Sequence, residues 1–164
     1  MKAHENDENT TVALLMHLYN PEMPALRIGD WINAYVGKNN KLNSIDLKTG
    51  IMTRRIKKNQ KADTKDIIPL PKSLIKFIQD SNIKGPLLGD LTSADIDVLL
   101  KKTFPNKKAS PRYFRDMYST KITPTLSKDE LKQVLKIMDH SAEIHGKHYR
   151  KHKGDALTEL ILGK

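Results

Sequence analysis

The chain has 164 residues, carries 29 lysines and arginines against 19 aspartates and glutamates, and contains no cysteine. Its length suits a single domain with its own core, and its formal charge of +10 favours a polyanionic partner, first of all nucleic acid. The lack of cysteine excludes a disulfide framework and a thiol nucleophile and predicts an intracellular protein, and no apolar run is long enough to predict a membrane span.

The first third of the chain is predicted to hold a polar leader and two helices. Residues 1–10 are polar and are expected to be disordered. The apolar residues between Thr11 and Tyr19 predict a buried helix that ends at Asn20-Pro21. A second helix is predicted from Ala25 to Val36, with Trp31 in the core.

The middle of the chain changes to strand periodicity. Ser44 to Leu47 and Ile51 to Ile56 flank the turn Lys48-Thr49-Gly50, which predicts a hairpin. A third strand is predicted from Asp66 to Leu70, after a basic connection. We therefore expect a small three-stranded antiparallel sheet.

The remainder of the chain is predicted to be helical. A helix follows Pro71, and three more begin at the N-caps Thr92, Ser110 and Ser127, two of which have a capping-box acid three residues later. The fold class expected from these elements is mainly α (α+β), with helices around the small sheet. Residues 11–154 would form one domain, and residues 155–164 carry a short apolar helix pattern that would be a sticky patch if exposed.

The most informative motif lies near the end of the chain. His140 occurs in Met138-Asp139-His140-Ser141, and Tyr149 follows among lysines, arginines and histidines. Surrounding cations lower the cost of a phenolate and hold an anionic substrate, so such a tyrosine is suited to attack a phosphodiester. This pattern predicts chemistry on nucleic acid.

Upstream segments complete a family pattern. Arg27 is followed by an acid at Asp30, Lys61 precedes Pro69 in the sheet region, and Arg112-Tyr113-Phe114-Arg115 lies on a predicted helix. With His140-Ser141 and Tyr149, these segments resemble, in order and spacing, the catalytic domain of the tyrosine recombinases (phage-integrase family) from about residue 12 to residue 155. The resemblance implies that family's helical catalytic fold and a site built from Arg27, Lys61, Arg112, Arg115, His140 and Tyr149.

The implied chemistry needs no metal and no cofactor. Two guanidiniums, Arg27 and Arg115, would bind the nonbridging oxygens of the scissile phosphate. Lys61, with Lys58 as the alternative, would protonate the leaving 5′ oxygen, and His140 would hydrogen-bond the phosphate. Tyr149 would attack in line and form a 3′-phosphotyrosine.

Two positions depart from the family pattern. Arg112 stands where the family usually has histidine, and a guanidinium cannot accept a proton near neutral pH. Asp139 stands where the family usually has glycine. Both substitutions bear on whether the chain cleaves DNA.

The expected partner is double-stranded DNA, gripped mainly through its backbone. The residues expected to contact DNA besides the catalytic set are Arg54, Arg55, Lys57, Lys58, Lys65, Lys147 and Arg150. The resemblance implies a homo-oligomer of two to four protomers on DNA, with residues 155–164 docked on a neighbour, and a location wherever that DNA lies: host cytoplasm, nucleus or viral factory.

Three functions fit the sequence. The first is a site-specific recombinase or integrase of a viral or mobile element. The second is a type IB topoisomerase of the small viral kind, which uses a nearly identical set of residues. The third is a relative that binds DNA without cleaving it, an alternative that the residues at positions 112 and 139 leave open.

Overall fold

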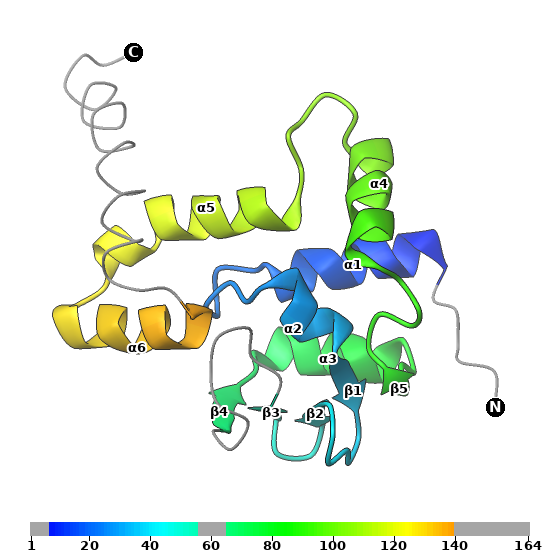
Figure 1. The fold of residues 1–164 in the computed structure, drawn as a ribbon, viewed down its shortest axis with the longest axis horizontal. Coiled ribbons are helices and arrows are strands. Elements are labelled where there is room, and N and C mark those ends of the chain that lie inside the picture. The colour runs from blue at the N-terminus through cyan, green and yellow to red at the C-terminus, as the bar shows by residue number, and fades with distance from the viewer. Residues whose placement is uncertain (1–6, 56–64, 140–164) are drawn as a thin grey trace.

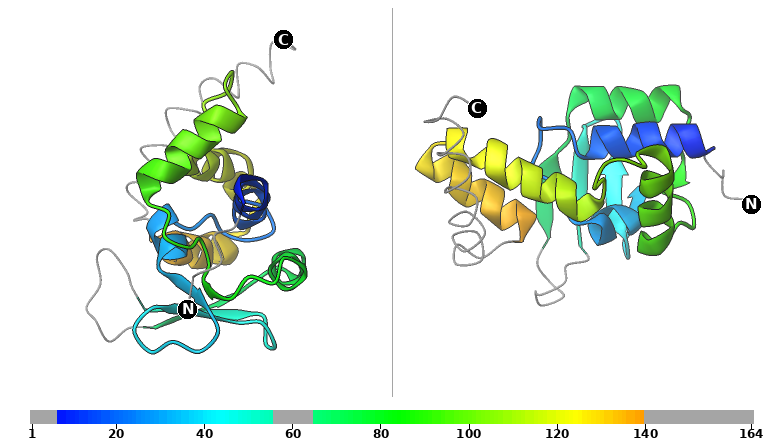
Figure 2. Two further views of the ribbon diagram at one scale, coloured as in Figure 1. Left: turned by 90° about the vertical axis from the view of Figure 1, so that its right-hand side faces the viewer. Right: turned by 90° about the horizontal axis from the view of Figure 1, so that it is seen from above.

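The computed structural model describes residues 7–55 and 65–139. Figure 1 shows a mixed sheet at the base of the molecule, with helices α1, α2 and α3 on one face and helices α5 and α6 extending to one side. Figure 2 shows the same arrangement from two further directions. The elements within the described residues run in the order α1 (Glu8–Leu18), α2 (Ile28–Ile32), β1 (Ala34–Val36), β2 (Asn43–Asp46), β3 (Ile51–Arg54), β4 (Asp66–Pro69), α3 (Lys72–Asp80), β5 (Gly85–Pro86), α4 (Ser93–Thr103), α5 (Pro111–Lys121), a short 3₁₀ turn η1 (Thr123–Thr125) and α6 (Lys128–Met138).

The predicted fold class is wrong. The sheet has five strands in the order β4-β3-β2-β1-β5 and is mixed, since β1 pairs parallel to β2 and the other neighbours pair antiparallel. The molecule is therefore a mixed α/β protein with six α-helices among its described residues. The three strands expected from the sequence are present as β2, β3 and β4, and the error lies in the two additional strands.

The missed strands are short and depend on distant partners. The helix predicted over residues 25–36 covers only Ile28–Ile32, and residues 34–36 form β1 instead. Strand β5 has two residues, Gly85 and Pro86, which no periodicity can reveal. Pairing across the sheet, rather than local pattern, determines both strands.

The helix starts agree with the predicted caps. The side chains of Thr92, Ser110 and Ser127 each accept a hydrogen bond from a backbone N–H three residues later. Helix α1 starts earlier than predicted, because Asp7 caps it and residues 8–10, expected to belong to the disordered leader, are helical.

Two apolar clusters hold these elements together. The larger one joins α1, α3 and α4 to the inner face of the sheet and includes Leu14, Trp31 and Met52, all fully buried. The smaller cluster consists of Ala25, Tyr118 and Met138. It fixes α5 and α6 against the segment that precedes α2.

Candidate functional site

The carboxyl end of α6 lies against the start of α2. Helix α6 begins in a capping box in which the Ser127 N–H donates to Glu130 Oε2 at 2.8 Å and the Glu130 N–H donates to Ser127 Oγ at 3.3 Å. At its other end Met138 is fully buried. The last carbonyls of a helix have no partner within the helix, so the packing of Met138 presents them to neighbouring side chains.

Arg27 binds this helix end at two points. Its Nη1 donates to Asp139 Oδ2 at 2.8 Å, and its Nη2 donates to the carbonyl oxygen of the same residue at 3.1 Å. The side chain of Arg27 is 26% exposed and that of Asp139 is 16% exposed, so the ion pair is partly shielded from water. Charge-assisted bonds of this kind are among the stronger hydrogen bonds in proteins.

Arg115 binds the same helix end from α5. Its Nη2 donates to the carbonyl oxygen of Met138 at 3.0 Å. Burial lowers the pKa of Arg115, and the nearby positive charge of Arg27 lowers that pKa further. The structure thus brings together two of the predicted phosphate-binding residues, Arg27 and Arg115, which we call the arginine pair.

Asp139 has a left-handed backbone, with φ of 55° and ψ of 42°, at the end of α6. Glycine is the usual residue in this conformation, and aspartate is one of the few others that adopt it. The conformation directs both acceptors of Asp139, its carboxylate and its carbonyl, to Arg27. His140 follows directly in sequence and lies outside the described residues.

Tyr19 lies beside the arginine pair. Its ring contacts Phe114 with the ring centroids 5.3 Å apart, and its Oη is buried without a hydrogen-bond partner among residues 7–55 and 65–139. Burial raises the pKa of the Tyr19 phenol, and the positive charge of Arg115 opposes that rise.

A third arginine, Arg54, is enclosed by carboxylates. Its Nε and Nη2 donate to Asp66 Oδ2 at 3.2 and 2.7 Å, and its Nη1 donates to Asp30 Oδ2 at 3.3 Å. Arg54 is 1% exposed. The same oxygen of Asp30 accepts the backbone N–H of Arg27 at 3.1 Å. Burial raises the pKa of Asp30, against the opposing charge of Arg54.

The Arg54 cluster, defined as Arg54, Asp30 and Asp66, corrects one prediction. Arg54 was expected to contact DNA, but the strand alternation that buries Met52 also buries Arg54 two residues later. A guanidinium that is almost completely buried between two carboxylate partners is not accessible to a DNA phosphate. Its role in this structure is to join β3, β4 and α2.

The other predicted residues occupy varied positions. Arg112 is exposed on α5, one turn before Arg115, and Lys65 is exposed before β4. Arg55 is half-buried and its Nη1 donates to Ser44 Oγ at 2.8 Å. The remaining predictions fall outside the described residues: Lys57, Lys58, Lys61, His140, Lys147, Tyr149 and Arg150.

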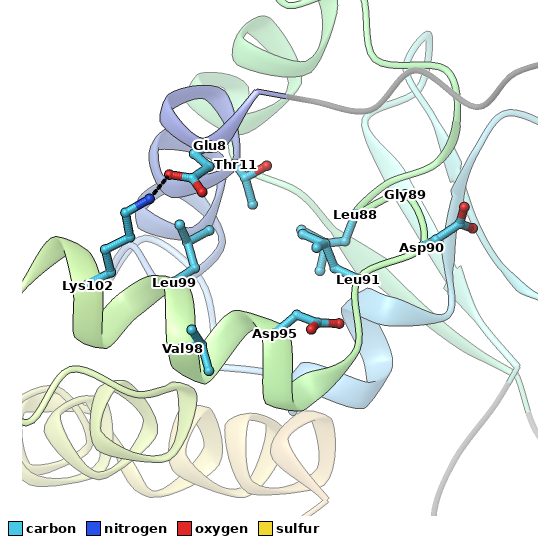
Figure 3. Close-up of a pocket in the computed structure, with 10 residues that line it drawn as sticks. All are labelled: Glu8, Thr11, Leu88, Gly89, Asp90, Leu91, Asp95, Val98, Leu99 and Lys102. Atoms are coloured by element: carbon cyan, nitrogen blue, oxygen red, sulfur yellow. Dashed lines mark hydrogen bonds and ion pairs between the residues drawn. The ribbon is translucent and has the colours of Figure 1, made fainter.

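A groove of about 470 Å³ lies between α1, α4 and the loop that follows β5 (Figure 3). Leu88, Leu91 and Leu99 are among its apolar lining residues, and the carboxylates of Glu8, Asp90 and Asp95 also line it. Its single lining lysine, Lys102, forms an ion pair with Glu8 at 2.6 Å. This excess of negative charge disfavours a nucleic-acid phosphate, so the groove is not part of the candidate site.

Sequence reasoning missed how Asp139 and Arg54 are used. Asp139 was noted only as a departure from the family's glycine, yet it is the counter-ion of Arg27. A signal was available, because aspartate is one of the few residues besides glycine that adopt the left-handed conformation at the end of a helix. For Arg54 the alternation with Met52 was the signal, hidden by the many cations nearby.

Within the two described ranges, no helix is long and apolar enough to cross a membrane, and no three His, Asp or Glu residues are grouped closely enough to hold a metal ion. Comparison of the chain with protein-family models, curated proteins and solved structures finds no match.

Proposed function

We propose that this chain cleaves and rejoins DNA strands through a tyrosine nucleophile, as a site-specific recombinase or integrase. The observation that carries the proposal is the convergence of Arg27 and Arg115 on the carbonyls of residues 139 and 138, immediately before His140 in the sequence. Two like-charged guanidiniums repel each other, and here the Asp139 carboxylate and the two carbonyls hold them at the same helix end. A phosphodiester is the anion that such a pair suits, because guanidiniums offer planar paired donors to its nonbridging oxygens.

The charge of the arginine pair supports this reading. The side chain of Arg27 is partly exposed, so an anion from solvent can reach the positive charge of the pair. In the proposed reaction this charge stabilises the phosphate as negative charge develops, and Tyr149 attacks to form a 3′-phosphotyrosine while the 5′ oxygen leaves. The bond energy is conserved, so another 5′ hydroxyl can reverse the step.

A covalent-capture assay tests the proposal. The protein is incubated with a pool of nicked duplexes of randomised sequence, and protein–DNA adducts are separated on a denaturing gel. We expect an adduct from the wild type, none from Tyr149→Phe, and an unchanged amount from Tyr113→Phe, because Tyr113 is an exposed tyrosine of α5. An adduct that persists in Tyr149→Phe would show that another residue is the nucleophile.

A second candidate is a protein that binds DNA without cleaving it. The observation that favours it is the contact of Asp139 with Arg27, which places a carboxylate on a guanidinium that the proposed reaction needs for phosphate. In that case no variant or wild-type protein forms an adduct, while duplex binding remains strong and salt-dependent.

A further inference from the structure

Arg27 already has an anionic partner within the chain. Asp139 contributes two acceptors, a carboxylate oxygen at 2.8 Å from Nη1 and a carbonyl oxygen at 3.1 Å from Nη2. A phosphate that binds the same edge of Arg27 must displace the carboxylate. A phosphate that uses the remaining donors of Arg27 lies next to a negative charge.

The contact belongs to the fold and not to a chance surface encounter. Met138 anchors the end of α6 in the smaller apolar cluster, and the left-handed backbone of Asp139 directs the acceptors to Arg27. Arg27 is itself fixed at the start of α2, where its backbone N–H donates to Asp30. Both partners are therefore held in place before any ligand arrives.

We propose that Asp139 is a specificity-determining residue of the arginine pair, which weakens the binding of free anions and reserves Arg27 for a phosphodiester of bound DNA. This inference rests on the DNA-binding part of the proposed function, since it assumes that the arginine pair receives a phosphate of bound DNA. A free phosphate gains only its contacts with the arginine pair, and these alone must compensate for displacing the Asp139 carboxylate. A phosphate within bound duplex arrives with backbone contacts elsewhere, which supply the free energy to displace the carboxylate.

The test compares phosphate binding by four full-length proteins at constant ionic strength. They are the wild type, Asp139→Asn, Asp139→Gly and the control Asp129→Asn. Asparagine and glycine both tolerate the left-handed backbone, so either replacement keeps the helix end. Asp129 is an exposed carboxylate in the first turn of the same helix, so its replacement changes the net charge equally, at the other end of α6.

We expect both Asp139 variants to bind inorganic phosphate about five- to tenfold more tightly than the wild type, as removal of a partly shielded counter-ion implies. Asp129→Asn should stay within about twofold, because solvent screens an exposed charge. In Arg27→Ala, the further change Asp139→Asn should give no gain. Calorimetry or the NMR signals of the arginine side chains report the affinity.

Duplex DNA provides the second arm of the test. Asp139→Asn should strengthen duplex binding by less than it strengthens phosphate binding, so that the preference for DNA over free phosphate falls. Phosphate affinities of the Asp139 variants equal to that of Asp129→Asn, or a gain that persists without Arg27, would overturn the inference. A gain in phosphate affinity with no covalent adduct from any protein would instead leave the inference standing and reject the proposed cleavage.

Discussion

Two arginine sites in this molecule differ in how deeply their guanidiniums are buried. In the Arg54 cluster one guanidinium is surrounded by two carboxylates and is almost completely buried. In the arginine pair Arg27 binds the carboxylate and the carbonyl of Asp139, Arg115 donates to the carbonyl of Met138, and Arg27 remains partly exposed. The first site is closed to solvent, whereas the second can be reached by an external anion.

The difference teaches how to separate structural from ligand-binding arginines in a basic protein. Both kinds make short hydrogen bonds to carboxylates, so the presence of an ion pair decides nothing. What decides is the access of water. A cation buried between carboxylates stabilises the fold, and a partly exposed cation can be reached by a phosphate.

The largest expected effect is on the stability of the Arg54 cluster. Arg54→Ala leaves Asp30 and Asp66 partly buried without their guanidinium, which should lower the free energy of unfolding by about 3–5 kcal/mol. Urea denaturation measures the change. Arg112→Ala, at an exposed position, is the control and should stay within about 0.5 kcal/mol. A change of equal size in both variants would contradict the structural role assigned to the Arg54 cluster.

The next largest effect is expected on the rate of DNA cleavage when either residue of the arginine pair is replaced. Arg27→Ala and Arg115→Ala should each reduce the rate of adduct formation by about 10²–10³, as the loss of a donor to a developing oxyanion does in other enzymes. Duplex binding should be largely kept, because many other cations share the backbone contacts. Binding lost in proportion to cleavage would make these residues general DNA anchors.

A smaller effect is expected at Tyr19, which lies beside the arginine pair. Tyr19→Phe removes a buried hydroxyl that has no partner in the described structure and should stabilise the protein by about 1 kcal/mol at neutral pH. Tyr113→Phe is the exposed control. Denaturant unfolding of both variants measures the difference, and a loss of stability in Tyr19→Phe would indicate that the hydroxyl has a partner after all.

Tyr19→Phe should also change how the stability of the protein depends on pH. Burial raises the pKa of Tyr19 in the folded protein above its ordinary value of 10.0, so the unfolded chain releases this proton first. Stability should therefore fall as the pH rises above about 10, and the fall should be smaller in Tyr19→Phe. Equal alkaline slopes in the wild type and the variant would contradict the assigned burial of the phenol.

The smallest effect is expected at Arg112. This exposed residue would act on DNA as one cation among many, so Arg112→Ala should weaken duplex binding about equally for all sequences and reduce the slope of log affinity against log salt by about 1. Affinity measured at several salt concentrations checks this. A loss of cleavage larger than the loss of binding would place Arg112 in the reaction, as the family resemblance implies.

The sequence by itself determined the local features of the fold. The caps Thr92, Ser110 and Ser127 were correct because a cap needs only a side chain and a backbone N–H a few residues away. The hairpin of β2 and β3 was correct for the same reason, since its turn and its alternation are local. The proposed catalytic set came from sequence order alone, and it stays a prediction.

Only the tertiary structure decided which cations are available. In the sequence, Arg54 lies in a run of basic residues, and Asp139 stands where the resembled family usually has glycine. Neither position indicates which residue of opposite charge it will contact. Arg54 contacts Asp66 through strand pairing and Asp30 through the packing of α2. Asp139 contacts Arg27 because the burial of Met138 in the smaller apolar cluster fixes the end of α6. The availability of a charge depends on burial and on partners distant in sequence, and these exist only once the chain has folded.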